Sequence, residues 1–82
     1  MSLTDEVRGG ANLPPPADRR RIRLEAGVTQ TRMATELGVA RSTFIWWETG
    51  AHQPDPANRA RYATLLRDLA RASAAPAEET RA

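Results

Sequence analysis

The chain has 82 residues, the length of one small domain, and it contains no cysteine, which excludes disulfides and thiolate metal sites. Its apolar runs are far shorter than a membrane span, and its first residues lack the basic start and apolar stretch of a secretory signal, so we expect a soluble cytoplasmic protein that does not enter a membrane. All 12 basic residues are arginine, against 10 acidic residues, which gives a formal net charge of +2.

The positive charge is concentrated in the middle of the chain. Residues 18–71 hold 10 arginines against 6 acidic residues, whereas the two ends together hold 2 arginines against 4 acidic residues. An all-arginine composition can reflect a GC-rich genome, or it can serve recognition, because the planar guanidinium matches phosphate and guanine. A basic middle with acidic ends fits a central nucleic-acid-binding unit.

The first predicted helix follows a proline-rich segment. Residues 1–12 include Gly9-Gly10 and few apolar side chains, which predicts a flexible arm. Pro14-Pro15-Pro16 favours an extended strut. Asp18 suits the N-cap or first turn of a helix that runs to about Ala26.

Two short helices come next, separated by a tight turn. Thr29 is a suitable N-cap for a helix over 30–37, and Gly38 suits the left-handed turn that ends it. A second helix is predicted over 41–49, with Phe44 and Trp47 on its inner face.

The last predicted helix spans about 57–72, after a turn that contains two prolines. Its apolar stripe consists of Tyr62, Leu65, Leu66 and Leu69. We therefore predict an all-α domain over residues 13–72 and a disordered tail over 73–82, with no strand.

Residues 22–50 resemble the XRE-type helix-turn-helix domains of phage repressors and Cro proteins. The resemblance rests on Ile22-Arg23, Gly27-Val28-Thr29-Gln30, Met33-Ala34, Leu37-Gly38-Val39, Arg41-Ser42-Thr43 and Trp47-Glu48-Thr49-Gly50. It implies a lambda-repressor-like fold of four or five helices that binds double-stranded DNA. Such proteins are usually transcriptional repressors or other regulators of bacteria and phages, and they commonly bind inverted repeats as homodimers. A nucleoid-associated location in the cytoplasm follows from this function.

The start of the helix over 41–49 contains the candidate base-reading residues. In a helix-turn-helix the N-terminal part of the second helix contacts base edges in the major groove. Arg41 can donate two hydrogen bonds to one guanine, and Ser42 and Thr43 can donate or accept. The alternative for Arg41 is a solvated or phosphate-bound surface arginine.

The phosphate contacts are predicted around the start of the preceding helix. The resemblance assigns Gln30 a phosphate contact, with packing on the recognition helix as a further role; an ordinary first-turn glutamine is the alternative. Nearby hydroxyl and arginine side chains would extend this contact. One arginine of the 19–21 cluster would grip the backbone beside the groove, and Arg59, with Arg61, would contact it from the other side. These residues are Thr29, Thr31, Arg32, Arg20 and Arg59.

One pair is assigned a structural role by the resemblance. Arg23 and Glu48 match positions that form a partly buried ion pair between the first helix and the end of the recognition helix. The alternative is two independent surface charges.

Two positions depart from the family pattern. The family usually has an apolar residue at position 19, where this chain has the first arginine of Arg19-Arg20-Arg21, a cluster that could grip phosphates or be solvated. We expect Leu13 and the proline strut to cover the gap at Arg19. At position 46 the family often has a polar residue that faces DNA, so Trp46 is a candidate base-reading residue. Trp46 could instead form an exposed protein-binding patch with Ile45.

Other classes of protein remain open. His52 lies in a proline-flanked turn without recognisable catalytic neighbours, so we expect no enzyme activity, cofactor or metal site. The same fold serves DNA-binding antitoxins and protein-interaction adaptors, for which the Ile45 and Trp46 patch would be the binding surface. An excision or architectural factor of mobile DNA is a third reading.

Overall fold

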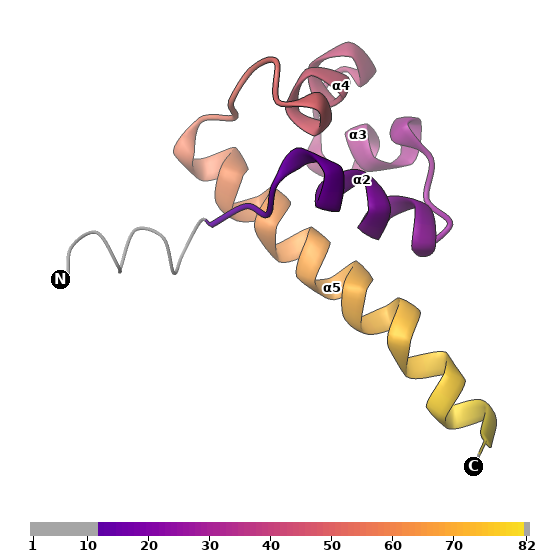
Figure 1. The fold of residues 1–82 in the computed structure, drawn as a ribbon. Coiled ribbons are helices and arrows are strands. Elements are labelled where there is room, and N and C mark those ends of the chain that lie inside the picture. Colours follow the sequence, from indigo (N-terminus) through magenta and orange to yellow (C-terminus); the bar gives the residue numbers. More distant parts are fainter. Residues whose placement is uncertain (1–11, 82) are drawn as a thin grey trace, which may run out of the picture.

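The computed structural model describes residues 12–81, which form four α-helices and no strand. The helices are α2 (Pro16–Glu25), α3 (Gln30–Leu37), α4 (Arg41–Thr49) and α5 (Pro56–Arg81). α5 passes beneath the other three helices and continues past them (Figure 1). The predicted all-α class is confirmed. The predicted flexible arm over 1–12 lies, except for its last residue, outside the described residues.

α2 begins two residues earlier than Asp18. Pro15 is its N-cap, and the Pro15 carbonyl accepts hydrogen bonds from the backbone N–H groups of Asp18 at 2.9 Å and Arg19 at 3.0 Å. Pro16 occupies the first helical position, where proline's fixed φ is favourable and its missing N–H costs nothing. Asp18 therefore lies in the first turn, and Pro16 belongs to the helix rather than to the extended strut that we predicted.

α3 and α4 have the predicted bounds because strong local signals define their ends. The Thr29 hydroxyl caps α3 by accepting a hydrogen bond from the Arg32 backbone N–H at 3.0 Å. Gly38 ends α3 with a φ of 72°, and Gly50 ends α4 with a φ of 84°. Both angles lie in the left-handed region that glycine adopts without strain.

α5 differs from the prediction at its C-terminal end. We expected a helix that ends near Ala72 and a disordered tail, whereas the helix continues to Arg81. The added segment contains alanine and glutamate, which have high helix propensity, and the helix passes through Pro76, which disfavours a helix interior. At the other end, Asp55 accepts hydrogen bonds from the Asn58 side chain at 2.6 Å and the Asn58 backbone N–H at 3.5 Å, and the side-chain bond is the main reason why the pKa of the Asp55 carboxyl is lowered.

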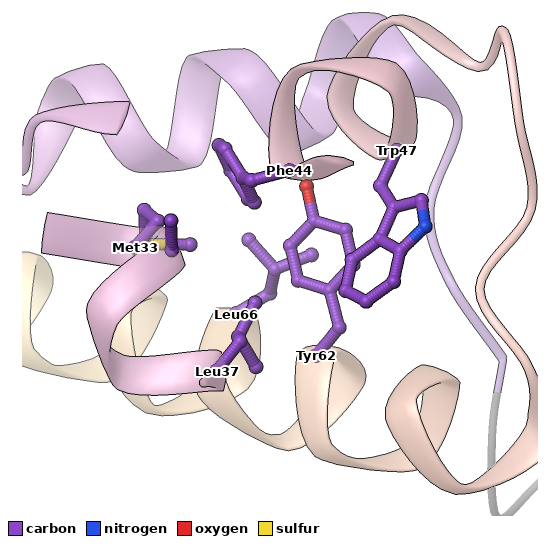
Figure 2. Close-up of a cluster of buried hydrophobic side chains, with 7 residues drawn as sticks. Met33, Leu37, Phe44, Trp47, Tyr62 and Leu66 are labelled. Atoms are coloured by element: carbon purple, nitrogen blue, oxygen red, sulfur yellow. The ribbon is translucent and has the colours of Figure 1, made fainter. Parts of the chain in front are cut away.

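The core lies where α3, α4 and α5 meet. Figure 2 shows its large side chains turned toward one another: Met33 and Leu37 from α3, Phe44 and Trp47 from α4, and Tyr62 and Leu66 from α5. The Phe44 and Tyr62 rings meet edge to face, with centroids 5.5 Å apart. This packing fixes the inner face of α4 on α5.

The Tyr62 hydroxyl is the polar exception in this core. It points toward α4 (Figure 2) and is buried without a hydrogen-bond partner among the described residues. Desolvation, followed by the negative charge of Glu48, raises the pKa of Tyr62 well above its ordinary value.

None of the helices in residues 12–81 combines the length and the apolar character that crossing a lipid bilayer requires.

Candidate nucleic-acid interface

The turn at residues 38–40 presents the first turn of α4 to solvent. Arg41 and Ser42 are exposed, and Thr43 is half-buried. Ala40 is the N-cap, and no side chain caps the first backbone N–H groups of the helix. Unpaired N–H groups at a helix N-terminus attract anions such as phosphate. The start of α4 therefore offers both side-chain donors and backbone donors.

An open hollow of about 370 Å³ lies beside this helix start. Its lining brings together five of the predicted DNA-contacting residues and the ion-pair arginine: Arg20, Arg23, Thr29, Gln30, Thr31 and Arg41. The lining comes from α2, α3 and α4, so residues far apart in the sequence share one surface. Guanidinium, amide and hydroxyl groups in one hollow suit an anionic oxygen ligand.

Gln30 links the two ends of α4. Its side-chain Nε2 donates to Glu48 Oε1 at 3.1 Å, and its Oε1 accepts from Arg41 Nη2 at 3.3 Å. One amide thus contacts both the last turn and the first residue of α4. The second proton on Nε2 and the backbone N–H at the start of α3 are the donors left for phosphate.

Arg23 and Glu48 form a two-pronged ion pair. Arg23 Nε lies 2.5 Å from Glu48 Oε2, and Arg23 Nη2 donates to Glu48 Oε1 at 3.1 Å. Arg23 Nη1 also donates to the Val28 carbonyl at 2.9 Å. The side chains of Arg23 and Glu48 are 8% and 3% exposed, respectively. The pair therefore joins α2 to the last turn of α4 inside the fold.

The arginine cluster at 19–21 does not act as one surface. Arg19 is only 6% exposed, its Nε donates to the Pro14 carbonyl at 2.7 Å, and its Nη1 donates to the Trp47 carbonyl at 2.7 Å. Arg20 lines the hollow, and Arg21 forms surface ion pairs within α2. A phosphate contact by Arg19, which the cluster suggested, is therefore wrong.

Sequence reasoning missed this inward arginine, although one signal was present. Arg19 lies four residues before Arg23, which places both side chains on the same face of α2. Since the resemblance assigned Arg23 a buried ion pair, that spacing could have indicated that Arg19 also faces α4.

Trp46 lies on the outer surface and is 48% exposed. Its ring stacks at a tilt on His52, with centroids 4.6 Å apart, and the His52 backbone N–H donates to the Trp46 carbonyl at 3.3 Å. Ile45 is half-buried, so it is less exposed than we expected, and the exposed aromatic surface consists of Trp46 and His52. His52 was not predicted to contact Trp46.

Two predicted phosphate contacts lie outside the hollow. Arg32 is exposed, and its Nε lies 3.0 Å from Glu36 Oε2 in a pair within α3. Arg59 is half-buried in the first turns of α5, and its Nε is buried without a partner among residues 12–81. Neither residue joins the group around Arg41.

Comparison with known proteins agrees with this geometry. The model of a protein family described as a helix-turn-helix domain matches residues 20–82, which is most of the chain and includes α3, the turn and α4. No curated protein and no solved structure matches the chain. The protein belongs to the helix-turn-helix domain family.

Proposed function

We propose that this protein is a sequence-specific, double-stranded-DNA-binding transcriptional regulator that reads the major groove with α4. The observation that carries the proposal is the exposed, uncapped first turn of α4 beside a hollow lined with arginine, amide and hydroxyl groups. An α-helix fits the major groove, and in a helix-turn-helix the start of the second helix meets the base edges.

Arg41 is the main base-reading residue in this proposal. Its contact with Gln30 uses one guanidinium nitrogen and leaves the remaining donors for a guanine. A side chain that is already oriented loses less conformational freedom when it binds. Ser42, Thr43 and Trp46 would contact neighbouring base edges or thymine methyl groups.

Phosphate contacts would come from the hollow and from arginines outside it. Thr29, Gln30, Thr31 and Arg20 line the hollow, and Arg32 and Arg59 would add contacts if their side chains turn toward the duplex. Only the arginines among these residues neutralise phosphate charge and release counterions, so Arg20, Arg32 and Arg59 predict that log affinity falls with log salt concentration with a slope of about −3.

Regulation would follow from occupying an operator and so excluding or recruiting polymerase in the cytoplasm. A homodimer bound to an inverted repeat is the arrangement that the resemblance supports, and sedimentation of the free protein and its DNA complex would test it. A repressor is the form of regulator we favour.

The test starts by selecting bound sequences from a random pool of double-stranded DNA. Arg41→Ala should then lower the preference for the selected sequence by about 1–3 kcal/mol, the usual value of a bidentate base contact, while general salt-sensitive binding persists. Arg71→Ala is the matched control, because Arg71 is an exposed arginine of α5 paired with Asp68. An unchanged preference in Arg41→Ala would remove Arg41 from base reading, and no affinity of the wild-type protein for any duplex at low salt would overturn the proposed function.

A protein-binding adaptor or antitoxin is the second candidate, favoured by the exposed Trp46 ring. Trp46→Ala separates the two: weaker binding to the selected duplex places Trp46 at the DNA, whereas unchanged DNA binding leaves that ring available to a protein partner.

A further inference from the structure

The C-terminal end of α4 is held by two buried arginines of one helix. Arg19 and Arg23 lie four residues apart on α2 and therefore share a face. Arg23 binds the Glu48 carboxylate, and Arg19 binds the backbone carbonyl of Trp47. The two guanidinium groups thus contact consecutive residues in the last turn of α4.

Arg19 suits the end of a helix in both charge and geometry. The last carbonyls of an α-helix lack partners within the helix and carry partial negative charge. The Trp47 carbonyl accepts only a long 3.3 Å hydrogen bond from the Gly50 backbone N–H, and Arg19 adds a bond of 2.7 Å. A buried cation therefore satisfies a backbone carbonyl in the last turn of α4.

The same arginine ties this terminus to the segment before α2. Arg19 Nε donates to the Pro14 carbonyl, two residues before the start of α2. A Cβ atom added at Gly50 would lie 3.0 Å from Pro16 Cγ, so the end of α4 also touches the start of α2 directly. Pro14, Pro16, Arg19 and the last turn of α4 form one packed unit.

We propose that Arg19 is a positioning residue that sets the tilt of α4 and thereby the DNA sequence preference of the protein. The inference rests on the proposed DNA-binding function. α4 has nine residues and is therefore about 13 Å long. A tilt of about 10° at its C-terminal end would move its first residue by about 2 Å, which is more than a binding site tolerates.

The competing interpretation gives Arg19 a purely structural role in stability. The two interpretations differ for Arg19→Leu, which replaces the buried cation by an apolar side chain and removes both hydrogen bonds. This substitution leaves the Pro14 and Trp47 carbonyls without their donor, so both interpretations allow some loss of stability, and the DNA preference of the folded variant separates them. If Arg19 is a positioning residue, Arg19→Leu will remain folded and lose discrimination between DNA sequences.

The experiment compares four variants with the wild-type protein. Arg19→Leu and Arg19→Gln are the test variants, since glutamine can donate to one carbonyl but cannot bridge both as Arg19 does. Arg21→Leu removes an exposed arginine from the same helix, and Leu69→Ala removes a half-buried side chain of α5 away from α4. The readouts are the fraction folded by circular dichroism and the ratio of affinities for the selected duplex and a scrambled duplex.

We expect Arg19→Leu to lower this ratio by about tenfold or more, as for the loss of a bidentate base contact, while it stays folded. Arg19→Gln should lie between Arg19→Leu and wild type, and the two controls should keep the wild-type ratio at matched fractions folded. A wild-type ratio in folded Arg19→Leu overturns the proposal, and if that variant does not fold, a wild-type ratio in Arg19→Gln does so. A wild-type protein with no preference between the duplexes overturns the proposed function instead.

Discussion

The two ends of α4 have opposite environments. The N-terminal end has no side-chain cap and exposes Arg41 and Ser42. In the last turn, Trp47 and Glu48 are buried and are held by Arg19 and Arg23. One end is thus available to a ligand, and the other is bound to the rest of the fold.

This difference separates recognition from stability along one short helix. Polar groups at the exposed end are solvated by water, so their loss changes stability little. Polar groups at the buried end depend on one another, so the loss of one leaves its partner desolvated. Gln30 connects the two ends, because its amide contacts both Glu48 and Arg41.

Glu48→Ala should cause the largest loss of stability of any single change at the anchored end. It leaves Arg23 buried without its counter-ion, which typically costs about 3–5 kcal/mol. Urea denaturation followed by circular dichroism measures this loss. The matched control is Glu36→Ala, because Glu36 pairs with Arg32 on the surface, where an ion pair contributes about 0–1 kcal/mol. Equal losses in the two variants would show that the buried pair does not hold α4.

The local features of α3 and α4 could be predicted from the sequence, because single residues near their ends determine them. Thr29 caps α3, and Gly38 and Gly50 provide the left-handed turns that end α3 and α4. For α2 the sequence left two positions open for Asp18, the N-cap and the first turn, and the structure has the second, because Pro16 takes the first helical position. α5 was ended too early, because the last ten residues include Pro76, which disfavours a helix interior, and yet the helix continues through it.

The sequence indicated which residues line the candidate site, but it did not indicate which of the neighbouring arginines are exposed and which are buried. The residues of the hollow were chosen from the sequence and lie together. The three consecutive arginines at 19–21 look alike in sequence, yet one is buried, one lines the hollow and one forms surface ion pairs. Which face of a helix packs inward depends on tertiary contacts, and the contact between Trp46 and His52 depends on the path of the intervening turn.

Gly50→Ala should lower stability by adding one methyl group at the C-terminal end of α4, and so tests how tightly this end is packed. The left-handed backbone alone costs a non-glycine residue about 1–2 kcal/mol. The new Cβ would also lie 3.0 Å from the Pro16 ring, so the total loss should exceed that range. Gly27→Ala is the control, because Gly27 has a similar φ of 74° but no neighbouring atom within 4 Å of the added carbon. Thermal unfolding of both variants measures the difference in stability. If Gly50→Ala loses no more stability than Gly27→Ala, the Pro16 ring moves away from the added methyl group without cost.

Tyr62→Phe should have the smallest effect on stability, and it should raise stability where the other two substitutions lower it. The Tyr62 hydroxyl lies beneath α4 without a partner among the described residues, so its removal should raise stability by about 1 kcal/mol. The variant also tests the raised pKa. Because burial favours the neutral phenol in the folded state, the Tyr62 hydroxyl ionises more readily in the unfolded chain. Its titration therefore leaves stability unchanged below the unfolded pKa of about 10 and lowers stability as pH rises above it.

Urea denaturation between pH 8 and pH 11 tests both parts of this prediction. Wild-type stability should fall more steeply above pH 10 than that of Tyr62→Phe, since only the wild-type unfolded state gains by ionising at this position. A parallel decline in both proteins would mean that the Tyr62 hydroxyl ionises as readily in the fold as in the unfolded chain. That result would require water or a polar partner beside the Tyr62 hydroxyl at the inner face of α4. The inner face of α4 would then be less different from its exposed face than the packing indicates.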